Sequence, residues 1–281
     1  MSTSVLFDAP GPQTRRRHLL YSIVFAAILA AVLVWVFWKL KAAGEFDSEV
    51  FHALSQPNIW QAISDGLIAT LKAAALAIVL AVVAGFLLAM GRLSDHAWLS
   101  VPCRLVIEFF RAVPVILLII FIFGLLGGRG LATETRGLIS LVGGLTLYNG
   151  SVLAEVFRAG IQAVPRGQGE AAYAVGMRKS QVMTLILTPQ AVRFMLPTII
   201  SQCVVALKDT SLGFIATYTE LLRELKLIAG FIDNYLMTYL LGALIYITLN
   251  SIVSVVATLL ERRLGRDRSK VRATEAVVPA G

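Results

Sequence analysis

Long apolar runs constrain this chain more than any other feature of its sequence. The first run, residues 19–38, contains no charged residue, and 57% of the chain is hydrophobic whereas 15% is charged. A helix of about 20 apolar residues crosses a hydrocarbon layer about 30 Å thick. Because lipid cannot satisfy exposed backbone groups, runs of this length form helices. The sequence therefore predicts an all-α, polytopic membrane protein.

Six runs are candidate spans: residues 19–38, 73–90, 112–128, 137–154, 189–207 and 235–260. The second helix is expected to begin near Gly66, and the fifth run is weaker because Arg193 and Pro197 interrupt it. The segment 208–233 is open: a short helix turning back near the outer surface is one interpretation. The first run follows Arg15–Arg17, as in a signal peptide, but it is longer than the roughly 7–15 residues of such a signal. We interpret it as a signal-anchor helix.

The distribution of lysine and arginine predicts the orientation of the spans. Arg15–Arg17 precede the first span, which favours a cytoplasmic N-terminus. Six spans then return the C-terminus to that side, where six basic residues lie between residues 262 and 272. The sequence thus predicts a multi-pass membrane protein with both termini in the cytoplasm. Membrane topology and anionic lipid account for the net charge of +8 without nucleic acid as a partner.

A polar loop between the fourth and fifth candidate spans carries the sequence PRGQGEAAYAVGMRKSQVMT, residues 165–184. Residues 166–169 are expected to form a polar turn. Glu170 is expected to start a short helix, since an acidic side chain is favourable at the positive end of the helix dipole. Ala171, Ala172 and Ala174 would present a small, smooth surface that a partner can approach closely.

The second half of this loop contains signals for a break between two helices. Gly176 either ends the first helix or permits a bend, and Ser180 is expected to cap the next helix. Two short helices at an angle can sit as a knob in the cleft of another protein. The alternative is an ordinary loop that closes over two spans. No G-x-x-x-x-G-K-[ST] phosphate loop occurs, so ATP hydrolysis by this chain is not predicted.

Five short motifs occur in the order found in one family of membrane proteins. They are DGLIATLK (65–72), EFFRAVP (108–114), EVFRAGI (155–161), EAAYAVG (170–176) and LKDTSL (207–212). With these motifs the chain resembles ABC importer permeases of the polar amino-acid (histidine/glutamine/glutamate) type. It is most similar to the second permease subunit of actinobacterial glutamate importers. Thr188 departs from the loop pattern, which has leucine at that position.

The resemblance implies a type I ABC importer permease fold over residues 63–263. Residues 1–62 would add a cytoplasmic N-terminus, a peripheral first span and an outer loop to a five-span core, and residues 264–281 would form a basic cytoplasmic tail. The coupling loop, near residues 161–185, would contact a cytoplasmic ABC ATPase dimer through Glu170, Ala171, Ala172 and Gly176.

The resemblance also implies the partners and the substrate. A second permease, a paralogue in a heterodimer, and an extracytoplasmic substrate-binding protein would complete the importer. ATP and Mg would be used by the ATPase, and this chain would bind no cofactor or metal and would have no catalytic residue. The substrate would be a polar amino acid that crosses the membrane by alternating access, with glutamate favoured over glutamine.

Ionisable and amide side chains within spans are costly in lipid and usually serve a cavity or a partner. Glu108 with Arg111, and Glu155 with Arg158, have the i,i+3 spacing of helix-surface pairs. These pairs could stabilise helix ends or line the translocation path. The candidate pathway residues are Arg111, Asn149, Glu155, Arg158, Gln202, Lys208, Asp209, Thr210 and Ser211.

Two other functions remain alternatives at this stage. An ion-driven secondary transporter of a small polar solute would show inverted repeats, and the sequence contains no convincing repeat. A membrane anchor or sensor subunit would not need the 165–184 loop. The two cysteines, Cys103 and Cys203, are interpreted as small packing residues.

Overall fold

The computed structural model describes residues 11–275, and every regular element in that range is helical. Side chains of Pro12, Ala257 and residues 260–275 are outside the description. The chain divides into two compact units between Gln56 and Pro57, and each is described by itself. The all-α prediction is confirmed.

The first unit contains α1 (Pro12–Ala42) and α2 (Ser48–Leu54). Every side chain from residue 13 to residue 39 is exposed, although most of the helix is apolar. A helix that is apolar on all faces is suited to lipid, not to water. The candidate span Gln13–Ala42 therefore agrees with the first predicted span.

The second unit is built on the contact between α3 (Pro57–Arg92) and α6 (Thr133–Gln162). Small residues of α3 repeat at every fourth position and are all buried: Ala73, Ala77, Ala81, Gly85 and Ala89. This spacing places them on one helix face, and small side chains allow membrane helices to approach closely. A Cβ on Gly85 would lie 2.8 Å from the carbonyl oxygen of Gly150 in α6. The two backbones are therefore as close as glycine permits.

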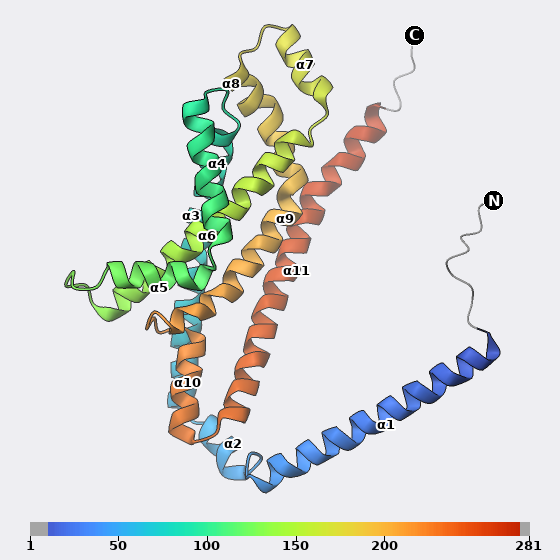
Figure 1. The fold of residues 1–281 in the computed structure, drawn as a ribbon, viewed down its shortest axis with the longest axis vertical. Coiled ribbons are helices and arrows are strands. Elements are labelled where there is room, and N and C mark those ends of the chain that lie inside the picture. The colour runs from blue at the N-terminus through green and yellow to red at the C-terminus, as the bar shows by residue number, and fades with distance from the viewer. Residues whose placement is uncertain (1–10, 276–281) are drawn as a thin grey trace. The chain divides into compact units, whose positions relative to one another are not determined.

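Two further long helices, α9 (Thr188–Asp209) and α11 (Tyr235–Glu275), and the short helix α10 (Leu221–Ile232) pack around this contact. α9 packs on α6, and α11 packs on α9. The segment 208–233, which was open at the level of sequence, forms the 3-10 helix η2 (Thr210–Phe214) and α10. α10 turns back and packs on α3 and α11 (Figure 1).

The candidate span over residues 112–128 is not one continuous helix. The chain forms α4 (Ala97–Ala112) and α5 (Val115–Leu125), which are bent by 102° relative to each other. Pro114 causes the break, because proline has no N–H and drives the preceding residue, Val113, into an extended conformation. Pro197 does not interrupt its helix, contrary to expectation: it lies inside the continuous α9.

Within residues 11–275, five helices are long and apolar enough to span a membrane, and the bent pair α4–α5 gives a sixth if it is taken as one span. The span count therefore agrees approximately with the predicted six. The basic tail predicted for residues 264–281 begins within α11, whose helix continues to Glu275. Residues 276–281 and the first ten residues lie outside the described part of the chain.

Candidate functional site

The 165–184 loop forms a separate helix at one end of the second unit, which we call the α7 end. α7 (Arg166–Ala174) lies there, and α10 lies at the opposite end (Figure 1). The predicted polar turn over residues 166–169 is wrong, since these residues are the first turn of α7. Pro165 precedes that turn, and its carbonyl oxygen accepts a hydrogen bond of 3.0 Å from the Gln168 N–H. Glu170 consequently lies in the second turn and does not start the helix.

The outward face of α7 differs from the predicted alanine surface. Glu170 and Ala171 are exposed, whereas Ala172 is only 6% exposed. Because Ala172 is small, α7 can lie close to the π-helix η1 (Val182–Leu187), on which it packs. Close to the buried Ala172 in the sequence, the side chain of Tyr173 is 51% exposed and that of Val175 is 78% exposed. The face offered to a partner is therefore part acidic and part apolar.

Gly176 ends α7, as predicted. Its φ is +81°, and its N–H donates to the carbonyl oxygen of Tyr173 at 2.9 Å. Such a left-handed residue after the last helical turn is a common helix end, and glycine adopts it without strain. Ser180 does not cap the next helix, contrary to expectation. α8 (Lys179–Gln181) begins one residue earlier, and Gln181 accepts a hydrogen bond of 2.9 Å from the Arg178 N–H.

Two side chains attach this loop to the rest of the second unit. The ammonium group of Lys179 donates to the carbonyl oxygen of Leu93 at 3.2 Å and forms an ion pair with Asp95. Both acceptors lie in the turn between α3 and α4. Gln190 of α9 donates to the Gln168 side chain of α7 at 3.3 Å. The loop is therefore attached at several points.

Thr188 is the residue that departs from the loop pattern. It begins α9 directly after η1, and its hydroxyl is buried without a hydrogen-bond partner among the described residues. The next residue, Pro189, has no N–H to continue an α-helical pattern. A widened π turn precedes this position, and π turns are frequent at functional sites.

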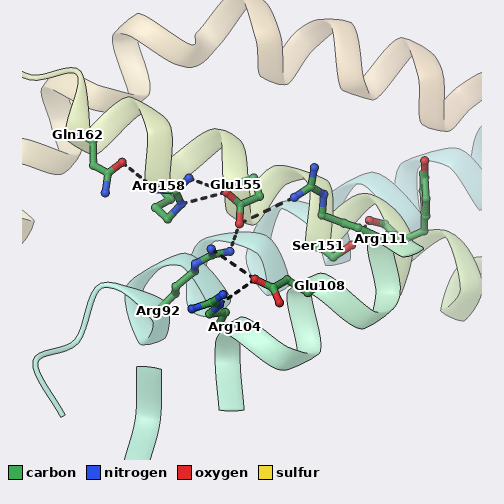
Figure 2. Close-up of polar contacts among 9 residues, drawn as sticks. Arg92, Arg104, Glu108, Arg111, Ser151, Glu155, Arg158 and Gln162 are labelled. Carbon is green, nitrogen blue, oxygen red and sulfur yellow. Dashed lines mark hydrogen bonds and ion pairs between the residues drawn. The ribbon is translucent and has the colours of Figure 1, made fainter. Parts of the chain in front are cut away.

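A group of charged side chains lies where α3, α4 and α6 meet. We call it the ion cluster, and its members are Arg92, Arg104, Glu108, Arg111, Glu155 and Arg158 (Figure 2). The Glu155 carboxylate is its centre. It pairs with Arg92 of α3, with Arg158 of its own helix at 2.9 Å, and with Arg111 of α4 at 4.0 Å. One carboxylate therefore contacts arginines from three helices.

Of the two ion pairs predicted within helices, one is confirmed and one is wrong. Glu155 does pair with Arg158, whose guanidinium also donates to Gln162 at 2.7 Å. Glu108 pairs with Arg104, four residues earlier on α4, at 2.8 Å and not with Arg111. The reason is that Arg111 lies at the end of α4 and points to Glu155 (Figure 2).

Arg92 is a member of this cluster that sequence reasoning missed. It is the last residue of α3 and contacts Glu155 and Glu108, the latter at 3.9 Å. Its position at a helix end that faces two acidic motifs was the available signal.

Asn149 and Gln202 are brought together, but away from the ion cluster. The Gln202 amide donates to Asn149 Oδ1 at 2.9 Å, and Asn149 donates to the carbonyl oxygen of Leu145 at 3.0 Å. Asn149 is 1% exposed. The pair therefore joins α6 to α9 inside the unit.

Lys208 and Ser211 line a groove of about 880 Å³ between α9, α10 and α11, which we call the α9–α11 groove. Asp209 is half-buried, and Thr210 is buried and donates to the carbonyl oxygen of Leu207 at 2.6 Å. Neither residue is among those that line the groove. α11 contributes polar side chains that sequence reasoning missed, and they recur on one face: Tyr246, Asn250, Ser251 and Ser254. Their spacing in an apolar run was the available signal.

One atom of this groove is unsatisfied. Asn250 Nδ2 donates to the carbonyl oxygen of Tyr246 at 2.7 Å. Asn250 Oδ1 is buried and has no hydrogen-bond partner within the described residues. Because buried polar atoms are normally hydrogen-bonded, such an acceptor needs an explanation, and a ligand is one.

Glu220 is a fully buried carboxylate that sequence reasoning also missed. It caps α10 by accepting hydrogen bonds from the N–H groups of Leu222 and Arg223 at 2.8 and 2.9 Å. Tyr246 of α11 donates to it at 3.1 Å. Burial raises the pKa of Glu220 to about 7, against the lowering effect of these hydrogen bonds and of the Arg223 charge. The group thus joins α10 to α11 between two candidate spans.

Comparison with known proteins places this geometry in a family. The family model of the binding-protein-dependent transport system inner membrane component matches residues 77–266. The glutamate transport system permease protein GluD of Corynebacterium glutamicum is 40% identical over 82% of this chain and 85% of its own length. The glutamate/aspartate import permease protein GltK of Escherichia coli O6:H1 is 30% identical over 71% of this chain and 92% of its own.

Solved structures agree with these relatives. An amino acid ABC transporter crystallised with histidines superposes with a TM-score of 0.68 at 29% identity, covering 75% of this chain and 97% of the other. The MetNI methionine ABC transporter, at 17% identity and a TM-score of 0.60, shares the fold. The 165–184 loop and four of the five motifs lie within residues 77–266, and the motif at residues 65–72 precedes them. The chain belongs to the family of binding-protein-dependent transport system inner membrane components, the permeases of ABC importers.

Proposed function

We propose that this chain is the permease subunit of an ABC importer that carries glutamate or a similar polar amino acid by alternating access. The observation that carries the proposal is α7, a short helix at one end of the unit with exposed Glu170, Ala171 and Tyr173. Relatives named as glutamate and glutamate/aspartate permeases support the substrate.

The form of α7 suits a docking element. A flexible loop would deform when a partner pushes on it and would not transmit the displacement. α7 is instead a helix that ends at Gly176, and its loop is attached to the rest of the unit through Gln168 and Lys179. An ATPase dimer that binds Glu170, Ala171 and Gly176 can thus move the whole end of the unit. ATP can drive this change only if the ATPase binds the two transporter states with different affinity.

Alternating access also needs the other partners of the importer. ATP and Mg are used by the ATPase, not by this chain. A paralogous second permease forms the pathway with this chain, and an extracytoplasmic binding protein delivers the substrate. The α7 end accordingly faces the cytoplasm, and the α10 end faces outward.

The α9–α11 groove is our choice for the substrate pathway in this subunit. The ammonium group of Lys208 suits a substrate carboxylate, and the Asn250 amide, whose buried Oδ1 lacks a partner among the described residues, can accept from the ammonium group of an amino acid once its side chain turns toward the groove. Ser211 adds a neutral hydroxyl. A cation and an acceptor in one groove complement a zwitterion better than an uncharged sugar.

Uptake of labelled glutamate tests this function in vesicles that contain the chain, its ATPase and the second permease, with binding protein added. We expect uptake to require ATP and to persist when ion gradients are dissipated. Lys208→Gln should lower uptake by about tenfold or more, since hydrogen bonds to charged groups contribute roughly 1.5–3 kcal/mol. Lys226→Gln, on α10, is the matched control.

The result that contradicts the proposal is equally specific. Uptake that follows an ion gradient and is indifferent to ATP would indicate a secondary transporter. ATP-driven uptake that is equally sensitive to Lys208→Gln and Lys226→Gln would remove the groove from the pathway and leave the importer in place.

A further inference from the structure

We propose that Glu155 is a positioning residue for transport: it passes the movement of α7 to the broken span α4–α5. The inference rests on the proposed docking of an ATPase at α7. It concerns a residue that touches neither the partner nor the groove described above. Its evidence is the geometry of the ion cluster (Figure 2).

The carboxylate of Glu155 is shared between three helices. Oε2 accepts from Arg158 of the same helix at 2.9 Å. Oε1 pairs with Arg92 of α3 and lies 4.0 Å from Nη1 of Arg111 of α4. The side chains of Glu155 and Arg92 are 18% and 19% exposed, so solvent screens their interaction less than it screens a surface pair. A displacement of Glu155 therefore acts on α3 and α4 together.

The place of Glu155 in the chain connects it to α7. It precedes the end of α6, Gln162, by about two helical turns, and α7 begins at Arg166 after a short connection. On the other side of α7, Lys179 is attached to Leu93 and Asp95 in the turn between α3 and α4. Both ends of the loop thus lead to the junction of α3 and α4.

The ion pairs that join α4 to α3 and to α6 have the longest nitrogen-to-oxygen distances in the cluster. Glu108 of α4 lies 3.9 Å from Arg92, and Arg111 of α4 lies 4.0 Å from Glu155. The contact of Arg104 with Glu108, at 2.8 Å, stays within α4. α4 can therefore exchange ion partners while α3 and α6 remain paired. Four arginines share two carboxylates in the cluster, so such an exchange leaves no carboxylate unpaired.

The consequence of such an exchange lies at the bend. α4 continues through Val113 and Pro114 into α5, which packs on α6. Movement of α4 therefore changes the angle of the broken span without unfolding either half. Discontinuous helices commonly form the substrate and ion sites of transporters, so a change in this bend can reach a site.

The test uses the assembled importer in vesicles with Glu155→Gln, which keeps the side-chain size but removes the charge. Three quantities are measured: ATPase that copurifies, ATP hydrolysed, and substrate transported per ATP. We expect an assembled, ATP-hydrolysing complex whose substrate-to-ATP ratio falls at least about fivefold, the lower end of typical coupling between sites. Glu155→Asp should restore most of the ratio, and Glu49→Gln, on exposed α2, should leave it unchanged.

A second variant covers failure of Glu155→Gln to fold. Arg111→Gln removes the 4.0 Å contact of α4 with Glu155 and leaves the pair of Arg92 with Glu155 intact. It should assemble normally and lower the same ratio. An unchanged ratio in Arg111→Gln, or in an assembled Glu155→Gln complex, would overturn the inference. If the unsubstituted importer moves no substrate with ATP, it is the proposed function that fails.

Discussion

At the scale of single residues, Gly176 is the position where backbone conformation matters most for α7. Its φ of +81° is the left-handed region, and a Cβ there would meet no atom within 4 Å. Substitution by alanine therefore introduces backbone strain and no steric clash. Gly169, within α7, also has open space around its Cβ position but has a helical conformation.

We expect Gly176→Ala to weaken ATPase binding by about 5- to 30-fold, because left-handed geometry disfavours an L residue by roughly 1–2 kcal/mol. Gly169→Ala adds the same methyl group to the same helix and should not weaken binding. Titration of purified ATPase onto the permease in lipid nanodiscs measures both. Equal affinities for the two variants would show that the end of α7 does not need its glycine.

The buried carboxylate of Glu220 predicts a pH dependence of stability. Its pKa of about 7 in the folded chain exceeds the ordinary value of 4.5, so the folded state keeps a proton that the unfolded state releases. The free energy of unfolding should therefore fall as the pH rises from about 4.5 to about 7, by up to about 3 kcal/mol, and level off above.

Thermal unfolding of the detergent-solubilised chain across this pH range measures the effect. Glu220→Gln removes the titrating group and should flatten the profile between these limits, while Glu49→Gln should not. Parallel profiles for Glu220→Gln and the unsubstituted chain would contradict the assignment. The charged and titratable groups in contact with Glu220 are Arg223 and Tyr246.

At the scale of elements, the contact of α3 with α6 depends on small residues. A Cβ on Gly85 would lie 2.8 Å from both the Gly150 oxygen and the Leu153 Cβ, and backbone cannot move aside cheaply. Gly85→Ala should lower the free energy of unfolding by about 1–3 kcal/mol, as overpacking does. Gly124→Ala, in α5 with no atom within 4 Å, is the matched control. Equal thermal midpoints for the two variants would show that the helices can separate without loss.

The helices themselves were predictable because lipid leaves few options for apolar runs, and the positions of five spans follow from composition. The size of the bend at Pro114 was not, because proline is tolerated in membrane helices and only packing decides how far it bends them. Pro197 shows the other outcome, inside a continuous α9. The turn of the chain at α10 depends on Glu220 capping α10 and contacting Tyr246, 26 residues apart in sequence.

The candidate site was predictable to a similar extent. The EAAYAVG motif located α7 and its end at Gly176, because a glycine after a short run of alanines is a local signal. The start of α7 and the burial of Ala172 depend on packing against η1, which no local pattern encodes. Arg92 and Glu155 are 63 residues apart, so their pairing emerges only when α3 lies along α6.

At the scale of the whole molecule, the second unit has two distinct ends. The ion cluster and α7 lie at one end, and the turn from α10 to α11 at Asp233 lies at the other (Figure 1). In the proposed function, the partner ATPase uses ATP at the first end, substrate enters from the second, and the long helices between them transmit the movement.

Cross-linking to the ATPase tests this arrangement most directly. A thiol-reactive photo-cross-linker is attached to Ala171→Cys or to Asp233→Cys, with Cys103 and Cys203 replaced by serine, in the assembled importer. The account predicts a cross-link from position 171 to the ATPase whose yield changes on ATP binding, and none from position 233. A cross-link from position 233, or none from position 171 in an importer that still transports with ATP, would contradict it.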